Sequence, residues 1–494
     1  MKVVKRPQNM DRDHLRPTTR DAIVERVRSL ALEAGAQPRE QGFSRLFPDL
    51  AAPAHRLPEG SRTLDRLLAL AEAMAEGEVI DREPRRKCAG DGDLPAAYTY
   101  LTAFVLNDLV WQRRPAGLPA RPSESAPMEC LDLLVNRRAG ALDLESIYDA
   151  PRDPQDVRRM LLGRVAPAPA GVAGPPRKAD ANDLPRQPRS LDPGRDRVAR
   201  VGDPRNDAML VMSQLHVAFL KAHNTLVGDG LTFQEARLAL RERYRWMVLN
   251  DLLPRLCDPQ VLAAARTRAA LGAGARASVP AEFAAAAFVL APTMARPSYD
   301  YNCRYRNVER GALGTRLVLG TAGRGYDALP EHWIIAWEGF LPLEALAPQR
   351  ARAIDSRIAG APAAAGTLAR RQLLEGYRLG LPTGQAVAAH LGLAPLSGAR
   401  LLAALPQSQR EAAAPFAQAT PLWFYILAEA GDPEGPAGVR LGPVGSHIVA
   451  ATLCGLMGRG LPDTPGRPFD HFTLSDLILL AAEQDLFPPE AAGP

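Results

Sequence analysis

Residues 200–224 read RVGDPRNDAMLVMSQLHVAFLKAHN and contain the clearest helix signal in the chain. Asn206 or Asp207 can act as the N-cap of this helix. Behind that polar start, an apolar stripe repeats with the spacing of an α-helix. The stripe consists of Ala208, Val211, Met212, Leu215, Phe219 and Leu220. We predict a long amphipathic α-helix here, and the same periodicity elsewhere in the chain decides the fold class.

Helical spacing recurs along most of the chain, whereas the alternation of period two that marks a strand is rare. A Pro- and Gly-rich connection, residues 166–194, is too long for an ordinary loop, and we expect it to wrap the surface. The pattern predicts a mainly α fold with few or no strands and with long irregular loops. The further predicted helices cover residues 64–74, 97–111, 233–253, 263–271, 281–290, 350–358, 368–377, 384–391, 421–430, 445–455 and 474–482.

The composition of the 494-residue chain is close to the globular average, with 46% hydrophobic and 23% charged residues, which excludes global disorder. Its 60 basic and 55 acidic residues give a thinly spread charge of +5, and only 6% of residues are aromatic. These values argue against a nucleic-acid partner. No apolar run approaches the ~20 residues of a membrane span, and no secretory signal is visible. Five scattered cysteines without a CxxC pair suit a reducing compartment, so we expect a cytoplasmic protein with no transmembrane segment.

The sequence lacks the common motifs of nucleotide binding and hydrolysis: Walker A, GxGxxG before a helix, GxSxG and HExxH. His216 and His223 lie seven residues apart on the predicted helix, whereas metal-binding histidines on adjacent turns lie four apart. We therefore interpret them as core or capping histidines. Asp143 and Glu145 could supply oxygen ligands to a hard cation, although alternating carboxylates in a loop are more often solvated or used as caps.

Arg205 stands just before the N-terminus of the long predicted helix. A phosphate or carboxylate there would meet both a guanidinium group and free backbone N–H groups. The alternative is a salt bridge from Arg205 to Asp203 or Asp207. Composition and spacing alone leave the function open.

Several long segments, in the same order, resemble the animal-type haem peroxidase superfamily and in particular its bacterial branch. They are GFSRLFPDL (42–50), LPAAYTYLTAFVLNDLV (94–110), LLVNRRAGALDLESIYD (133–149), the quoted residues 200–224, EFAAAAFVLAPTMARPSYDYN (282–302), LLEGYRLGLPTGQAVA (373–388), TPLWFYILAEA (420–430) and RLGPVGSHIVAATLCGLM (440–457). The resemblance implies a single helical peroxidase-like domain over residues 42–487. An N-terminal arm, residues 1–41, would precede it, and a tail, residues 488–494, would follow it.

The resemblance implies haem b buried between a distal and a proximal helix, and oxidation by peroxide. At the position of the distal histidine, however, the sequence has Asn107, which cannot accept and return a proton at useful pH. At the position of the proximal histidine, the iron ligand, it has Pro292, which has no lone pair to give and should kink its helix. Ala103 and Leu106 replace the glutamine and the haem-linking aspartate of the distal motif.

The remaining family positions are partly retained. Arg205 matches the catalytic arginine, but Ala208 replaces the second haem-linking carboxylate. Gln385 lies at or near the position of the residue that supports the proximal histidine. Met209 matches a position where some members link a methionine to haem, although a core methionine is the simpler interpretation. Cys303, past the Pro297 break, is an unlikely substitute for the iron ligand.

The calcium site of the family is better retained, since Asp108, Asp143 and Glu145 occupy its acidic positions while Ala139 replaces a hydroxyl ligand. Two functional hypotheses follow. The first is a protein that has lost haem and peroxidase activity and acts as a scaffold or binds an apolar carboxylate in the vacated haem cavity. The alternative is an active haem-dependent peroxidase or fatty-acid-type oxygenase that responds to peroxide and uses an unrecognised axial ligand.

Overall fold

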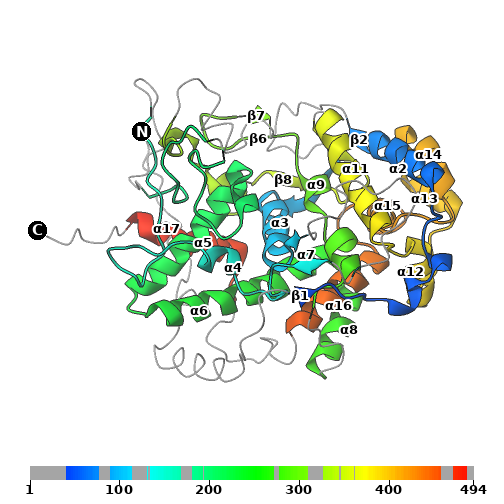
Figure 1. The fold of residues 1–494 in the computed structure, drawn as a ribbon, viewed down its shortest axis with the longest axis horizontal. Coiled ribbons are helices and arrows are strands. Elements are labelled where there is room, and N and C mark those ends of the chain that lie inside the picture. Colours follow the sequence, from blue (N-terminus) through cyan, green and yellow to red (C-terminus); the bar gives the residue numbers. More distant parts are fainter. Residues whose placement is uncertain are drawn as a thin grey trace, which may run out of the picture.

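The structure is a computed structural model. It describes residues 41–76, 90–113, 131, 134–168, 181–192, 194–271, 278–306, 308–309, 326–343, 347–360, 362–457 and 471–486. The expected arm and tail, residues 1–41 and 488–494, lie outside the described residues apart from Gln41. Helices dominate the described part, which confirms the predicted fold class (Figure 1). The longer helices are α2 (Ser61–Ala73), α3 (Ala97–Leu109), α5 (Leu210–Gly228), α6 (Phe233–Trp246), α8 (Pro259–Ala270), α11 (Pro362–Arg378), α15 (Leu422–Gly431), α16 (Pro443–Met457) and α17 (Leu474–Leu486).

Shorter helical segments join these. They are α4 (Glu145–Tyr148), α7 (Leu253–Leu256), α9 (Ala291–Met294), α12 (Gly384–His390), α13 (Gly398–Ala404), α14 (Gln407–Ala413), the 3-10 turns η2 (Pro48–Ala51) and η5 (Pro204–Asp207), and the π-helical turns η6 (Met247–Leu252) and η7 (Phe283–Ala287). Helices α4, α5, α6 and α17 gather at one end of the molecule, and α2 and α11–α15 at the other (Figure 1). Helices α3 and α9 lie between the two groups and touch, because Oγ1 of Thr99 donates a 3.3 Å hydrogen bond to the main-chain oxygen of Met294.

The sequence predicts few or no strands, and the described residues contain nine short ones. They are β1 (Gln41–Gly42), β2 (Ala75–Glu76), β3 (Asp91–Pro95), β4 (Gln112–Arg113), β5 (Val135–Asn136), β6 (Ser298–Tyr299), β7 (Val308–Glu309), β8 (Arg350–Arg352) and β9 (Ile358–Ala359). They form one three-stranded sheet, β1-β5-β4, and three two-stranded pairs among the described residues. The helix predicted for residues 350–358 is therefore wrong: β8 pairs with β3 and β9 with β2, and a turn capped by Asp355 separates them.

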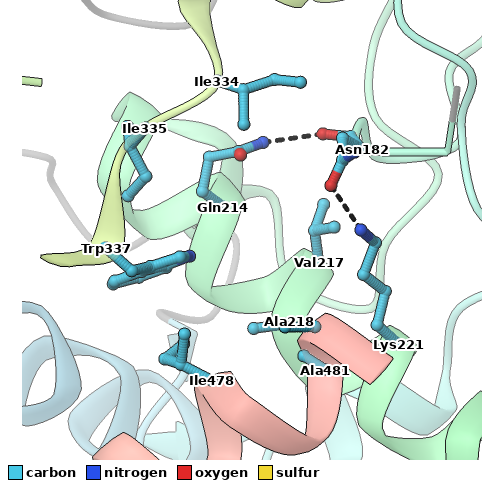
Figure 2. Close-up of a pocket in the computed structure, with 11 residues that line it drawn as sticks. Asn182, Gln214, Val217, Ala218, Lys221, Ile334, Ile335, Trp337, Ile478 and Ala481 are labelled. Atoms are coloured by element: carbon cyan, nitrogen blue, oxygen red, sulfur yellow. Dashed lines mark hydrogen bonds between the residues drawn. The ribbon is translucent and has the colours of Figure 1, made fainter. Parts of the chain in front are cut away.

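Helix α5 carries most of the sequence quoted above and is enclosed by its neighbours. The sequence predicts that only one face of this helix is buried. In the structure every residue from Leu210 to Val227 is buried, because α3, α6 and α17 pack around the helix. Its buried polar groups are bonded internally: Nε2 of Gln214 donates to the main-chain oxygen of Asn182 at 2.8 Å, and the amine of Lys221 to the Asn182 side chain (Figure 2). The cavity beside them measures about 30 Å³, which is room for water and not for a larger ligand.

The predicted N-cap of α5 is also corrected. The helix begins at Leu210 with Met209 as its N-cap, whereas Asn206 and Asp207 belong to the preceding turn η5. The side chains of these two residues are bonded elsewhere, and Asp207 forms an ion pair with Arg186 at 2.9 Å. Tertiary partners therefore compete successfully with the local capping role.

The proximal segment does not form one kinked helix, as predicted for residues 281–290 and Pro292. A π-helical turn, η7, ends at Ala287. The next three residues are not helical, and a separate short helix, α9, begins at Ala291. Pro292 lies in the first turn of α9, where a missing N–H costs no helical hydrogen bond. The proline therefore starts a helix. None of the described helices combines the length and hydropathy needed to span a bilayer.

Candidate functional site

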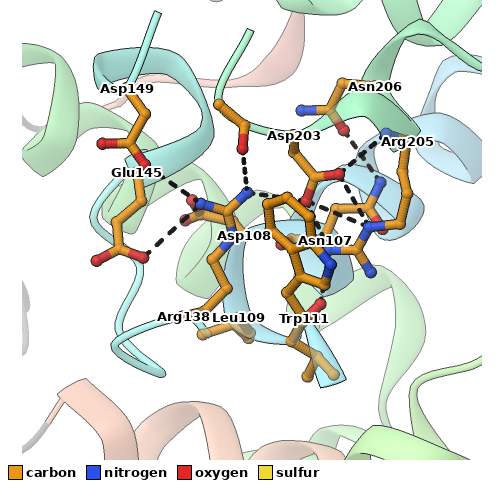
Figure 3. Close-up of polar contacts among 12 residues, drawn as sticks. Asn107, Asp108, Leu109, Trp111, Arg138, Glu145, Asp149, Asp203, Arg205 and Asn206 are labelled. Carbon is orange, nitrogen blue, oxygen red and sulfur yellow. Dashed lines mark hydrogen bonds and ion pairs between the residues drawn. The ribbon is translucent and has the colours of Figure 1, made fainter. Parts of the chain in front are cut away.

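The predicted distal residue, Asn107, lies near the C-terminal end of the largely buried helix α3. Its amide Nδ2 donates a 3.0 Å hydrogen bond to Oδ1 of Asn206 in η5 (Figure 3). The Nδ2 of Asn206 in turn contacts Nδ1 of His216 in α5 at 3.2 Å. The three side chains form a chain of hydrogen bonds that joins α3 through η5 to α5, so the amide of Asn107 is already used by the protein.

His216 ends this chain as a neutral imidazole. The ring is completely buried against Phe104, and burial lowers its pKa to about 3. Because Nδ1 accepts the hydrogen bond from Asn206, the ring proton lies on Nε2. Within the described residues, this Nε2 has no hydrogen-bond partner. A protonated ring nitrogen has no lone pair for a metal, so His216 does not supply the missing imidazole.

Arg205, at the family position of the catalytic arginine, is held by its own turn and by the end of α3. Its Nε and Nη2 both bond to the carboxylate of Asp203, with Nη2 and Oδ2 2.6 Å apart. Nη2 also donates to the main-chain oxygens of Asn107 and Val110 at 3.0 and 2.7 Å. The salt bridge from Arg205 to Asp203, one of the alternatives left open by the sequence, is confirmed. The guanidinium group thereby caps the C-terminal end of α3.

Asp203 is the centre of a buried charge cluster that the sequence analysis missed (Figure 3). Nη2 of Arg138 lies 2.8 Å from Oδ2 of Asp203, and the two side chains are 2% and 0% exposed. Although burial favours the protonated form, hydrogen bonds and charges from Arg205 and Arg138 hold the pKa of Asp203 below its usual value. One carboxylate shared by two guanidinium groups thus ties η5 both to α3 and to the segment after β5. The only sequence signal was the short spacing between Asp203 and Arg205.

Two of the three predicted calcium ligands, Asp143 and Glu145, face arginines. Oδ1 of Asp143 lies 2.6 Å from Nη2 of Arg245, and Oε2 of Glu145 lies 3.9 Å from Nη1 of Arg138. Across the part of the chain that the structure describes, no group of three or more His, Cys, Asp or Glu side chains could hold a metal ion. Guanidinium groups compensate the carboxylates of Asp143 and Glu145 in this structure, and the calcium site stays a prediction from the sequence.

Asp108 itself is completely buried, and its Oδ2 accepts a 3.2 Å hydrogen bond from the N–H of Leu144. Burial raises its pKa to about 7, even though the charge of Arg138 acts in the opposite direction. A substantial fraction of this side chain is therefore the neutral acid at neutral pH.

On the proximal side, Pro292 is half-buried in α9 and offers no donor atom. The chain just before it is held by Trp423, whose Nε1 donates to the main-chain oxygen of Val289 at 2.9 Å. Gln385, the predicted support of the proximal ligand, is bonded to Thr420 instead. Its Nε2 donates to Oγ1 of Thr420 at 2.8 Å, and its Oε1 accepts from the Thr420 N–H at 2.9 Å. The amide therefore joins α12 to the start of α15.

These residues do not fit a haem iron, which requires an axial nitrogen, sulfur or anionic oxygen ligand. Pro292 has none, Asn107 is bonded to Asn206, and the accepting nitrogen of His216 is occupied. Cys303 is exposed to solvent, unlike a thiolate ligand in a haem pocket. The site defined by these residues is a buried polar network without an iron ligand, and we derive no chemistry through haem.

The fold and the site thus define a helical protein with the layout of a haem peroxidase. A family model described as animal haem peroxidase matches residues 128–317. Peroxidase A from Dictyostelium discoideum is similar in structure over 84% of this chain and 88% of its own, with a TM-score of 0.50 and 15% identity. Fatty acid alpha-dioxygenase from Oryza sativa is similar over 87% of this chain and 78% of its own, with a TM-score of 0.51 and 12% identity. None of the curated proteins matches the chain significantly in sequence.

Identities this low establish a shared fold and no shared activity. The family model matches residues 128–317 and the solved structures share the fold over most of the chain, so the chain is similar to animal haem peroxidases in fold. Its place in the bacterial branch stays a prediction from the sequence.

Proposed function

We propose that this chain is a peroxidase-fold protein that does not ligate haem and does not reduce peroxide, and that it acts as a scaffold or binding protein. The observation that carries the proposal is Pro292, which lies in the first turn of α9 and which the sequence resemblance assigns to the position of the iron ligand. Proline is the one residue whose own nitrogen is part of a tertiary amide, so no rearrangement of its side chain can create a donor.

The distal residues support the same proposal. General acid–base catalysis on peroxide needs a group that accepts and returns a proton near neutral pH, and an asparagine amide does neither. The amide of Asn107 is bonded to Asn206, and the Nε and Nη2 of Arg205 are bonded to Asp203 and to the end of α3. Arg205 and Asn107 thus have structural partners that explain their presence without catalysis.

Restoring the imidazoles tests the proposal. The double variant Asn107→His, Pro292→His should bind haem when it is expressed with a haem precursor, with a Soret band well above that of the wild type. The control is Ala291→His, which places an imidazole on the same helix at the adjacent position and on a different side of it. It should bind no more haem than the wild type.

Stoichiometric haem in the wild-type protein would contradict the proposal and restore peroxide-dependent chemistry with a different axial ligand. Equal haem uptake by the control and the double variant would contradict the assignment of Pro292 to the iron-ligand position. Melting temperatures recorded in parallel show whether each variant is folded.

A further inference from the structure

A cavity of about 310 Å³ lies away from α3 and α9, between α8, α12, α16 and the chain that enters η2. Helices α8 and α16 lie side by side (Figure 1). Small side chains, Ala265 and Ala269 on α8 and Ala451 and Gly455 on α16, line the cavity. Their size leaves the space between the helices open. A volume of this size lies at the lower end of the range of small-molecule sites.

Part of the cavity lining is apolar and held in place by buried hydrogen bonds. Phe47 is buried there next to Leu46. The N–H groups of these two residues donate to the carboxylate of Glu282, at 3.3 and 2.9 Å. Glu282 is itself buried at the start of η7, so the wall is anchored to the core. A wall anchored in this way is formed before any ligand arrives, which reduces the entropy lost on binding.

The polar lining residues are all basic or imidazole side chains: Arg268, His390 and His447. Among the described residues that line the cavity, none is acidic. Arg268 is exposed in the last turn of α8, and His390, at the end of α12, packs edge-on against Phe47 with ring centres 5.4 Å apart. The full positive charge of a guanidinium exceeds the partial negative charge at a helix C-terminus, so the entrance favours an anion.

We propose that this cavity binds a small amphipathic anion, with an unbranched apolar body between α8 and α16 and a carboxylate or similar head group at Arg268. The apolar walls bury the hydrocarbon and the guanidinium pairs with the charged end. The imidazoles of His390 and His447 offer further polar contacts at the entrance. The inference is independent of haem loss, because no residue of the cavity belongs to α3, η5 or α9.

Calorimetric titration of the full-length protein with decanoate, decanol and decyltrimethylammonium tests the inference. Decanoate should bind about 5-fold more tightly than decanol, which is the gain expected from one solvent-exposed charge pair. Decyltrimethylammonium should bind most weakly. Arg268→Ala should reduce the affinity for decanoate to that for decanol, while Arg370→Ala, an exposed arginine on α11, should leave it unchanged.

A second pair of variants tests the apolar part of the site. Ala265→Phe fills the cavity and should lower the affinity for decanoate and decanol by more than tenfold. Ala263→Phe, two residues away on the exposed side of α8, should change neither affinity. Unchanged melting temperatures show that the variants are folded.

Three results would overturn the inference. One is no binding of decanoate by the full-length wild type. Another is binding that Ala265→Phe leaves intact, which would place the ligand elsewhere. The third is a wild-type dimer that Ala265→Phe converts to a monomer, which would assign the cavity to a second copy of the chain.

Discussion

At the scale of single residues, the polar network around α3 depends on Asp203. Its carboxylate is fully buried and is shared by Arg138 and Arg205. Removing one partner of a buried ion pair leaves the remaining charges without compensation, and the cost of that exceeds the value of the pair itself. The network therefore stabilises the fold around the residues that the sequence resemblance assigns to the distal site.

Asp203→Asn should reduce the free energy of unfolding by ~3–5 kcal/mol, because the buried Arg138 would lose its 2.8 Å ion pair and keep only the longer contacts to Asp149 and Glu145. Denaturant unfolding followed by circular dichroism measures the loss. Asp156→Asn is the matched control, since its partner Arg158 is exposed and the pair should contribute nothing measurable. An equal effect of the two substitutions would show that the buried cluster has no special role.

The raised pKa of Asp108 leads to the prediction that the stability of the protein depends on pH. Burial raises its pKa to about 7 in the folded protein, compared with ~3.9 in an unfolded chain. The folded state therefore binds the proton more tightly, and the stability from this group is complete below about pH 4 and is lost as the pH rises to about 7. Asp108→Asn cannot titrate. The stability of the variant relative to the wild type should increase over that range, by at most ~1.4 kcal/mol per pH unit.

Urea unfolding of both proteins at several pH values measures this difference, and subtraction removes the contribution of other groups such as His216, whose lowered pKa acts in the opposite direction. Parallel stability curves for the two proteins would mean that Asp108 titrates normally in the folded state.

At the scale of elements, the sequence predicts the helices that are long enough to show a periodic apolar pattern. Long helices such as α5, α11 and α16 carry apolar positions at helical spacing, and all of them are present. Strands of two or three residues, such as β8 and β9, are too short to display period-two alternation, and they exist through pairing with β3 and β2. The same reason explains the error over residues 350–358, where local composition suits a helix and tertiary pairing decides otherwise.

The candidate site is likewise predictable from the sequence only in part. The assignment of Asn107 and Pro292 to the histidine positions rests on the register of the flanking motifs in the sequence and stays a prediction. Their surroundings do not, because the bond from Asn107 to Asn206 joins residues 99 positions apart and that from Gln385 to Thr420 joins residues 35 apart. Such contacts are set by packing and leave no signal at the sequence positions themselves.

The ion pairs of Asp143 and Glu145 lead to a prediction about the effect of calcium on thermal stability. Because Arg245 and Arg138 compensate Asp143 and Glu145, neither added calcium nor a chelator should change the melting temperature, as scanning calorimetry would measure. A melting temperature that rises steadily with calcium concentration would show that an ion displaces the arginines and that the family site is retained.

At the scale of the whole molecule, the helical framework is similar to that of solved haem peroxidases, and we propose that the groups that serve iron and peroxide are replaced within it. A fold depends on many buried apolar contacts, whereas axial ligation depends on one side chain. A substitution such as Pro292 at the start of α9 can therefore remove the chemistry and leave the packing intact.

The proposal that the chain does not ligate haem is tested most directly by the visible spectrum of the full-length wild-type protein during titration with haem, together with the amount of haem retained after gel filtration. The wild-type protein should take up no stoichiometric haem and show no Soret shift typical of axial ligation. A sharp Soret band that saturates at one haem per chain and survives gel filtration would contradict the proposal.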